Sequence, residues 1–228
     1  MPFLEIACFN PQSALVAAKA GASRIELCAN ASAGGLTPPL AELRELKEDP
    51  SVTIPIYVMI RPHDRSFTLT LAELSSMEEE IRAFNREGAD GYVFGALTEH
   101  GAVDEEKCRV LIDAAGGRPC TFHRAFDALP EDRMEEELEK LVSCGFENVL
   151  TSGGMKSASE GKEALRRLVT QAGNRIVVIV GGGVRSSNAA MLRECGASSF
   201  HSSAIVSTDG GEIANTEEIQ SLTRILEE

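Results

Sequence analysis

The sequence predicts a (β/α)8 barrel, also called a TIM barrel, and two observations support this fold class. Short runs rich in β-branched residues alternate with amphipathic helical stretches along the 228 residues, and the alternation repeats eight times. The connections are short, which favours parallel strands joined by right-handed crossovers. A doubly wound open sheet is the alternative, but no Gly-rich dinucleotide fingerprint follows the first strand. We therefore expect residues 1–228 to form one barrel domain.

Each predicted strand is a short apolar run, and each predicted helix follows it with a helical spacing of apolar residues. Several helices end at a glycine, which accepts the left-handed conformation of a helix C-terminus. Those stop signals are Gly21, Gly88, Gly145 and Gly196. In chain order, the strand and helix pairs are 3–8 and 11–20, 24–28 and 39–47, 54–60 and 71–86, 91–94 and 104–115, 119–123 and 131–143, 148–151 and 159–171, 175–180 and 187–194, and 198–202 and 216–226.

Composition excludes several classes of partner. The formal net charge of −13 argues against nucleic acid, whose phosphates need a basic protein face. No apolar run approaches the roughly 20 residues of a membrane span. Residues 1–5 lack the basic start of a signal peptide, which favours the cytoplasm. The six cysteines show no CxxC spacing, so they indicate neither a zinc site nor, in a reducing compartment, disulfides.

Strand parity predicts which polar side chains enter the barrel. Side chains alternate between the lumen and the apolar helix layer, so the residue between two helix-facing aliphatic residues points inward. Glu5 and Glu26 meet this condition, and the same alternation turns three further titratable residues inward. All five should converge on one pocket at the carboxyl ends of the strands, where barrel active sites lie. They are Glu5, Glu26, Arg61, His123 and His201.

The densest group of candidate catalytic residues lies in the segment 121–127, directly after the fifth predicted strand. His123 should face the lumen, and either His123 or Glu26 would act as acid and base. Arg61 or Arg124 would hold a carboxylate or phosphate of the substrate as a planar fork. Asp127 would pair with Arg124 or help to start the next helix.

The last three predicted strands end in loops rich in glycine and serine. Such loops allow close approach of the backbone to an anion, and in this fold the loops after strands seven and eight commonly hold phosphate. The expected anion-binding residues are Ser152, Gly153, Gly181, Gly182, Gly183, Ser202 and Ser203. Tight turns alone are the alternative explanation for the glycines.

Several motifs resemble the CutC family of (β/α)8 barrels, named for copper homeostasis. They are the segments 24–28, 34–38, 59–62, 94–98, 121–127, 149–153, 181–183 and 201–204. The resemblance implies a cytosolic, often homo-oligomeric protein linked to copper. It also implies Cu(I) binding by cysteines of the first two strands, here Cys8 and Cys28. The usual first-strand cysteine position of the family is Ala7 in this chain, and parity turns Cys8 away from Cys28.

These observations lead to two hypotheses for the function, from different classes of protein, and to a third that assigns no present activity. The first is a copper homeostasis protein that binds Cu(I) in or near the barrel mouth, with Cys28 as a soft donor. The second is an enzyme that uses acid–base chemistry on a small anionic or phosphorylated metabolite. The third is a scaffold whose polar lumen is a relic of earlier chemistry.

Overall fold

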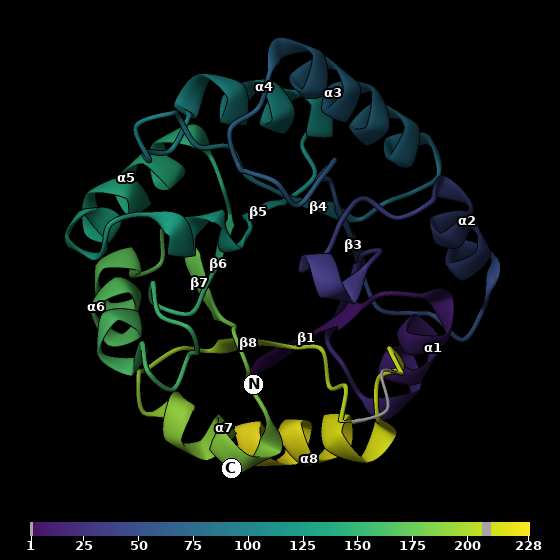
Figure 1. The fold of residues 1–228 in the computed structure, drawn as a ribbon. Helices are drawn as coiled ribbons and strands as arrows, with labels where there is room; N and C mark the ends of the chain where they lie inside the picture. The colour runs from purple at the N-terminus through teal and green to yellow at the C-terminus, as the bar shows by residue number, and fades with distance from the viewer. Residues whose placement is uncertain (1, 207–210) are drawn as a thin grey trace.

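The computed structural model describes residues 2–206 and 211–228 and has the predicted (β/α)8 architecture. Eight parallel strands pair in chain order, and β8 pairs with β1 to close the barrel. Helices surround the strands as an outer ring, and α8 lies beside α7 and α1 where the two ends of the chain meet (Figure 1).

The element bounds agree with the expected ranges to within a few residues. The strands are β1 Phe3–Cys8, β2 Arg24–Leu27, β3 Ile56–Met59, β4 Gly91–Phe94, β5 Cys120–Phe122, β6 Asn148–Thr151, β7 Val177–Val180 and β8 Ser199–Ser202. The helices are α1 Pro11–Ala20, α2 Leu40–Glu48, α3 Leu71–Arg86, α4 Glu105–Ala115, α5 Met134–Cys144, α6 Lys162–Ala172, α7 Ser186–Arg193 and α8 Thr216–Glu227.

The segment after β5 contains a helical element that the predicted ranges, strand 119–123 and helix 131–143, do not include. Residues Arg124–Ala128 form a short 3₁₀ helix. His123 caps it, because its ring Nδ1 accepts the backbone N–H of Ala125 at 3.3 Å. The sequence pattern missed this helix because a single 3₁₀ turn is too short to show a periodicity.

The barrel wall separates two apolar clusters, as strand parity predicts. The large outer cluster includes Leu4, Ile6 and Leu27 and packs between the strands and the helices. The small inner cluster consists of Cys28, Tyr57, Met59 and Val93, with Phe9 against it. Polar residues fill much of the remaining lumen.

Register places the most deeply buried charges next to one another. Glu5 on β1 pairs with Arg24 on β2 and, on the other side, with His201 on β8. Ala7, one inward position further along β1, pairs with Glu26. Three neighbouring strands thus present two carboxylates, an imidazole and a guanidinium to the same part of the lumen. None of the helices in the described part of the chain is both long and apolar enough to cross a membrane.

Candidate functional site

A cavity of about 200 Å³ opens at the carboxyl ends of the strands, and we call it the mouth pocket. Six titratable or cationic side chains line it: Glu26, Arg61, His123, Arg124, Arg185 and His201. Four of the five predicted lumenal residues are therefore gathered here. The fifth, Glu5, lies beneath the pocket and contacts it through His201.

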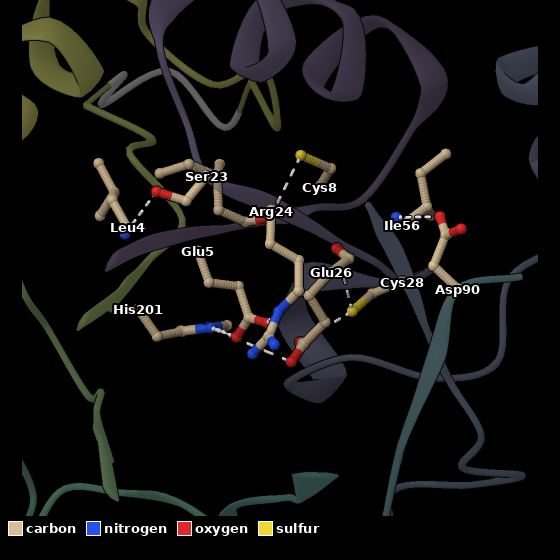
Figure 2. A network of polar contacts seen from close by, with 11 residues as sticks. Leu4, Glu5, Cys8, Ser23, Arg24, Glu26, Cys28, Ile56, Asp90 and His201 are labelled. Carbon is tan, nitrogen blue, oxygen red and sulfur yellow. Dashed lines mark hydrogen bonds and ion pairs between the residues drawn. The ribbon is translucent and has the colours of Figure 1, made fainter. Parts of the chain in front are cut away.

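Glu5 is fully buried between two cationic partners. One oxygen accepts from Nε of Arg24 at 2.6 Å, and the other contacts Nδ1 of His201 at 2.7 Å (Figure 2). Burial alone would raise the pKa of Glu5, but Arg24 and His201 outweigh it and hold the pKa at about 2. Because Glu5 occupies Nδ1 of His201, Nε2 is the ring nitrogen left for a ligand.

Arg24 is fixed at the base of this network by aromatic rings as well as by Glu5. Its guanidinium lies 3.9 Å from the ring centroid of Tyr57 and 4.9 Å from that of Phe3. Only 4% of Arg24 is exposed, so its charge depends on Glu5 for compensation. Sequence reasoning missed Arg24, although it shares the inward parity of Glu26.

Glu26 is the buried carboxyl group of the mouth pocket. Oε1 accepts from the Cys28 thiol at 3.2 Å, whereas Oε2 is buried with no hydrogen-bond partner among the described residues. Oε2 lies 4.0 Å from Nδ1 of His201. Burial raises the pKa of Glu26, so the group is tuned toward proton transfer. An unpaired buried oxygen that lines a cavity is a natural partner for a ligand.

His201 receives opposite influences from its surroundings. Burial lowers its pKa, but the carboxylates of Glu26 and Glu5 outweigh burial and raise the pKa above the ordinary value. His201 therefore holds a second ring proton more readily than a free imidazole does.

His123 lines the pocket but is set up as a neutral donor and not as a base. Burial, with Arg61 nearby, lowers the pKa of His123 to about 3. Because Nδ1 accepts from Ala125, the ring proton resides on Nε2. The expectation that an imidazole titrating near neutrality acts as acid and base does not suit this ring. Gly95 makes room for it, since a Cβ there would lie 2.7 Å from Nδ1.

Arg61 is held at the pocket by neutral groups. Its Nη1 donates to the backbone oxygens of Ala33 at 2.9 Å and Gly35 at 3.2 Å. The guanidinium lies 5.0 Å from the ring centroid of Phe67, and that ring packs edge-on against His123. Phe67 comes from the loop before α3 and gave no signal in the sequence.

Arg124 and Asp127 connect the β5 exit to the β6 exit. Arg124 donates from Nε to Asp127 at 2.7 Å and from Nη2 to Oγ of Ser152 at 3.0 Å. Asp127 in turn accepts from Oγ1 of Thr151 at 2.5 Å and from the amide of Ser152 at 2.9 Å. Asp127 therefore positions the loop after β6, and it neither starts α5 nor lines the pocket.

The β6 loop consequently has few donors left for an anion. The amide of Ser152 is taken by Asp127, and that of Gly153 donates to Oγ1 of Thr151 at 2.9 Å. Gly181 continues the barrel ladder by donating to the carbonyl of Thr151. Ser152, Gly153 and Gly181 are thus supports of the predicted anion site and do not line the mouth pocket.

The exits of β7 and β8 do present free donors. Gly182, Gly183, Ser202 and Ser203 all line the pocket. The amides of Gly182 and Gly183 donate to no acceptor within the described residues. Gly182 has a φ of +92°, and a Cβ there would lie 2.8 Å from Cβ of Ser152, so the turn requires glycine.

Arg185, which sequence reasoning did not single out, completes this side of the pocket. Its Nη1 donates to Oγ of Ser202 at 2.9 Å, and Nη2 donates to Oγ of Ser203 at 3.2 Å. Two carbonyls, of Val184 and Ile205, accept its other hydrogen bonds. Its position after a glycine run at a strand exit was the signal that could have identified it.

The two candidate copper ligands do not lie together. Cys8 belongs to the outer core cluster, whereas Cys28 belongs to the inner one, and their side chains point in different directions (Figure 2). Burial raises the pKa of both thiols well above the ordinary value. A site formed by the thiolates of Cys8 and Cys28 therefore does not fit this structure, because they occupy opposite sides of the barrel wall.

Fold and site define a general class: a (β/α)8 barrel with a cation-rich pocket at the carboxyl ends of its strands. The particular family follows from comparison with known proteins. The model of the CutC family matches residues 3–206, and the chain belongs to this family.

Named relatives agree with this assignment. The chain is 45% identical over 209 residues to the human copper homeostasis protein cutC homolog, covering 91% of this chain and 75% of the relative. It is 43% identical over 189 residues to a family protein CutC of Pasteurella multocida, covering 83% of this chain and 76% of that protein. The crystal structure of a copper homeostasis protein CutC from Streptococcus agalactiae superposes with a TM-score of 0.84 at 32% identity, covering 89% of this chain and 99% of that one.

Proposed function

We propose that this chain is an enzyme that carries out acid–base chemistry on a small anionic, phosphorylated metabolite bound in the mouth pocket. One observation carries the proposal. Arg61 and Arg185 line the pocket, and neither forms an ion pair with a carboxylate among the described residues, although the charge of Asp64 acts on Arg61 from a longer distance. This is notable in a chain with 35 acidic and 22 basic residues, where acidic partners are abundant.

The charge balance inside the pocket favours a negatively charged ligand. Arg124 is paired with Asp127, and Glu26 faces His201, so these four charges largely offset one another. The guanidinium groups of Arg61 and Arg185 remain, held in place by carbonyls, hydroxyls and a ring. Guanidinium groups without an ion-pair partner, beside free amides, favour a carboxylate or phosphate through their charge and their remaining donors. Nε and Nη2 of Arg61 have no acceptor among the described residues, and Arg185 keeps Nε, since both of its Nη atoms already donate.

The remaining side chains supply the chemistry. Glu26, with a raised pKa and an unpaired oxygen, would take a proton from the substrate, and His201 would return one. Glu5 is a positioning residue that holds the His201 ring by Nδ1. His123 would donate its Nε2 proton to an oxygen on which negative charge develops. This set suits proton abstraction next to a carbonyl, or an isomerisation that passes through an enolate.

The anion site is tested by titrating inorganic phosphate into the protein by calorimetry, at constant ionic strength with chloride as the reference anion. We expect phosphate to bind, and Arg185→Met to weaken it about 10- to 100-fold, because a charged hydrogen-bond donor contributes about 1.5–3 kcal/mol. Arg82→Met, on the exposed face of α3, is the matched control and should bind as the wild type does. Failure of the wild type to bind phosphate would contradict the proposal.

A second candidate function is Cu(I) binding, and one observation favours it beside the names of the relatives. A Cβ built on Gly35 would lie 3.4 Å from Sγ of Cys28 and 3.5 Å from Cε of Met59, so a thiol and a thioether lie under the same turn. Thiolate and thioether sulfurs are ligands that Cu(I) prefers. The proton of Cys28 would have to leave on binding, which makes the affinity depend on pH.

Competition of the protein with a Cu(I) chelator tests this second candidate. We expect Cys28→Ser to abolish competition, while Cys8→Ser, in the outer core, leaves it unchanged. Ala7→Cys, which places a second inward thiol on β1, should raise the affinity. Equal affinity of Cys28→Ser and wild type would eliminate the Cys28 site.

A cytoplasmic location is also part of the proposal. All six cysteines are free thiols, a state typical of reducing compartments. Assembly into a homo-oligomer stays a prediction from the family resemblance.

A further inference from the structure

We infer that the ligand of the mouth pocket carries two anionic groups at opposite ends: a phosphate at the exits of β7 and β8, and a carboxylate at the exit of β3. The inference rests on the proposed function and narrows its substrate class to short phosphorylated carboxylates. It depends on where these two arginines, neither of them ion-paired within the described residues, lie around the barrel.

Arg61 and Arg185 reach the mouth pocket from different strand exits: carbonyls of the loop after β2 hold the guanidinium of Arg61, and hydroxyls at the exit of β8 hold that of Arg185. Arg61 follows β3 and Arg185 follows β7, and strands four apart in a closed ring of eight lie at opposite ends of a diameter. Figure 1 shows β3 and β7 on opposite sides of the central opening. Both side chains nevertheless line one cavity. Because different loops hold the two guanidinium groups, each can bind an anionic group of its own.

The β7–β8 side has the donors that a phosphate needs. Arg185 is fixed by four neutral oxygens, from Val184, Ser202, Ser203 and Ile205. The amides of Gly182 and Gly183 add backbone N–H groups that have no acceptor in the described chain. Several convergent donors around one cation suit a group with three terminal oxygens.

The side of the mouth pocket at the exit of β3 offers a single guanidinium group, that of Arg61. It suits a planar anion that is smaller than a phosphate. Nη1 of Arg61 is held by Ala33 and Gly35, and Nη2 has no acceptor within the described residues. The guanidinium also lies against the ring of Phe67. A carboxylate matches the planar edge of an arginine. The glycine amides beside Arg61, of Gly34 and Gly35, already donate to the carbonyls of Ala31 and Asn30.

The size and the remaining side chains of the pocket agree with a short ligand. About 200 Å³ lies below the 300–1,000 Å³ typical of sites for drug-sized molecules. A ligand stretched between β3 and β7 would pass His123, from β5, on one flank. On the other flank it would pass His201, from β8, and Glu26, from β2. The carbon atoms between its two anionic ends would then lie among the three proton-handling groups.

Two matched probes test the inference by calorimetry. 2-Phosphoglycolate carries both anions, whereas ethyl phosphate has the same length and lacks the carboxylate. We expect the wild type to bind 2-phosphoglycolate at least 10-fold more tightly than ethyl phosphate. Arg61→Met should remove that advantage and leave the affinity for ethyl phosphate unchanged. Arg185→Met should weaken both probes. Thermal melts confirm that each variant is folded, and Arg61→Gln or Arg185→Gln replaces the corresponding methionine variant if that one is not.

The possible outcomes separate this inference from the proposal beneath it. Equal affinity of the wild type for the two probes would overturn the two-anion ligand while leaving the phosphate site intact. An advantage that persists in Arg61→Met would overturn the assignment of the carboxylate to Arg61. Binding of neither probe would count against the proposed function itself.

Discussion

Replacing Glu5 with alanine is expected to lower the free energy of unfolding by about 3–5 kcal/mol, because it leaves a buried arginine without its counter-charge. Arg24 is 4% exposed and is packed between Phe3 and Tyr57, so its guanidinium cannot reach water. His201 loses its partner at Nδ1 in the same variant. Urea denaturation at pH 7 measures the change through its midpoint and slope.

Two further variants show whether the loss comes from the unpaired charge. Combining Glu5→Leu with Arg24→Met removes both charges and should restore much of the stability, since hydrophobic replacement of a buried pair is often neutral. Glu87→Ala breaks the exposed pair with Arg44 and should produce a change too small to resolve. A stability of Glu5→Ala close to that of the wild type would show that Arg24 is not confined as described.

Acidification is expected to destabilise the wild type more than a His123→Asn variant. In the folded chain His123 stays neutral down to about pH 3, because burial and the Arg61 charge oppose its protonation. In the unfolded chain it binds a proton below its ordinary pKa of 6.5. Stability contributed by the neutral ring is therefore complete above pH 6.5 and is lost as the pH falls toward 3.

The size of this effect follows from how steeply the free energy of unfolding changes with pH when a group binds a proton only in the unfolded chain. Each pH unit in that window costs about 1.4 kcal/mol, so the wild type should lose about 3 kcal/mol more than the variant between pH 6.5 and 4. We compare the two proteins only down to pH 4, because carboxyl groups such as Glu5, whose ordinary pKa is 4.5, take up protons in the unfolded chain at lower pH.

Asparagine is the matched replacement because its side-chain oxygen can still cap Ala125. The remaining neighbours of the ring, Phe67, Phe122 and Gly95, carry no charge. Parallel pH profiles for the two proteins would mean that His123 is protonated in the fold.

Sequence reasoning predicted the barrel and the lumenal side of the site because both follow from a local alternation. Strand parity alone placed Glu5, Glu26 and His201 in one lumen, and the register of β1 with β2 and β8 explains their contacts. It also turned Cys8 away from Cys28. Arg24 obeys the same parity but was overlooked, since a charged residue at the start of a strand resembles an exposed end.

What the sequence did not predict depends on contacts between loops. Asp127 lies one 3₁₀ turn after β5, yet its carboxylate organises the loop after β6, a contact that no spacing in the chain reveals. The neutral state of His123 depends on burial and on Phe67 and Arg61, which come from another strand exit. Of the two residues predicted as acid and base, His123 and Glu26, the lowered pKa of His123 favours Glu26 for that role in our proposal.

A crystal structure of the wild type grown with phosphate tests the anion site most directly. We expect tetrahedral density within hydrogen-bond distance of the Gly182 and Gly183 amides and of Arg185, at the β7–β8 side of the mouth pocket. Only water at that position, in crystals where phosphate is bound elsewhere on the protein, would contradict the assignment of this pocket to an anionic substrate.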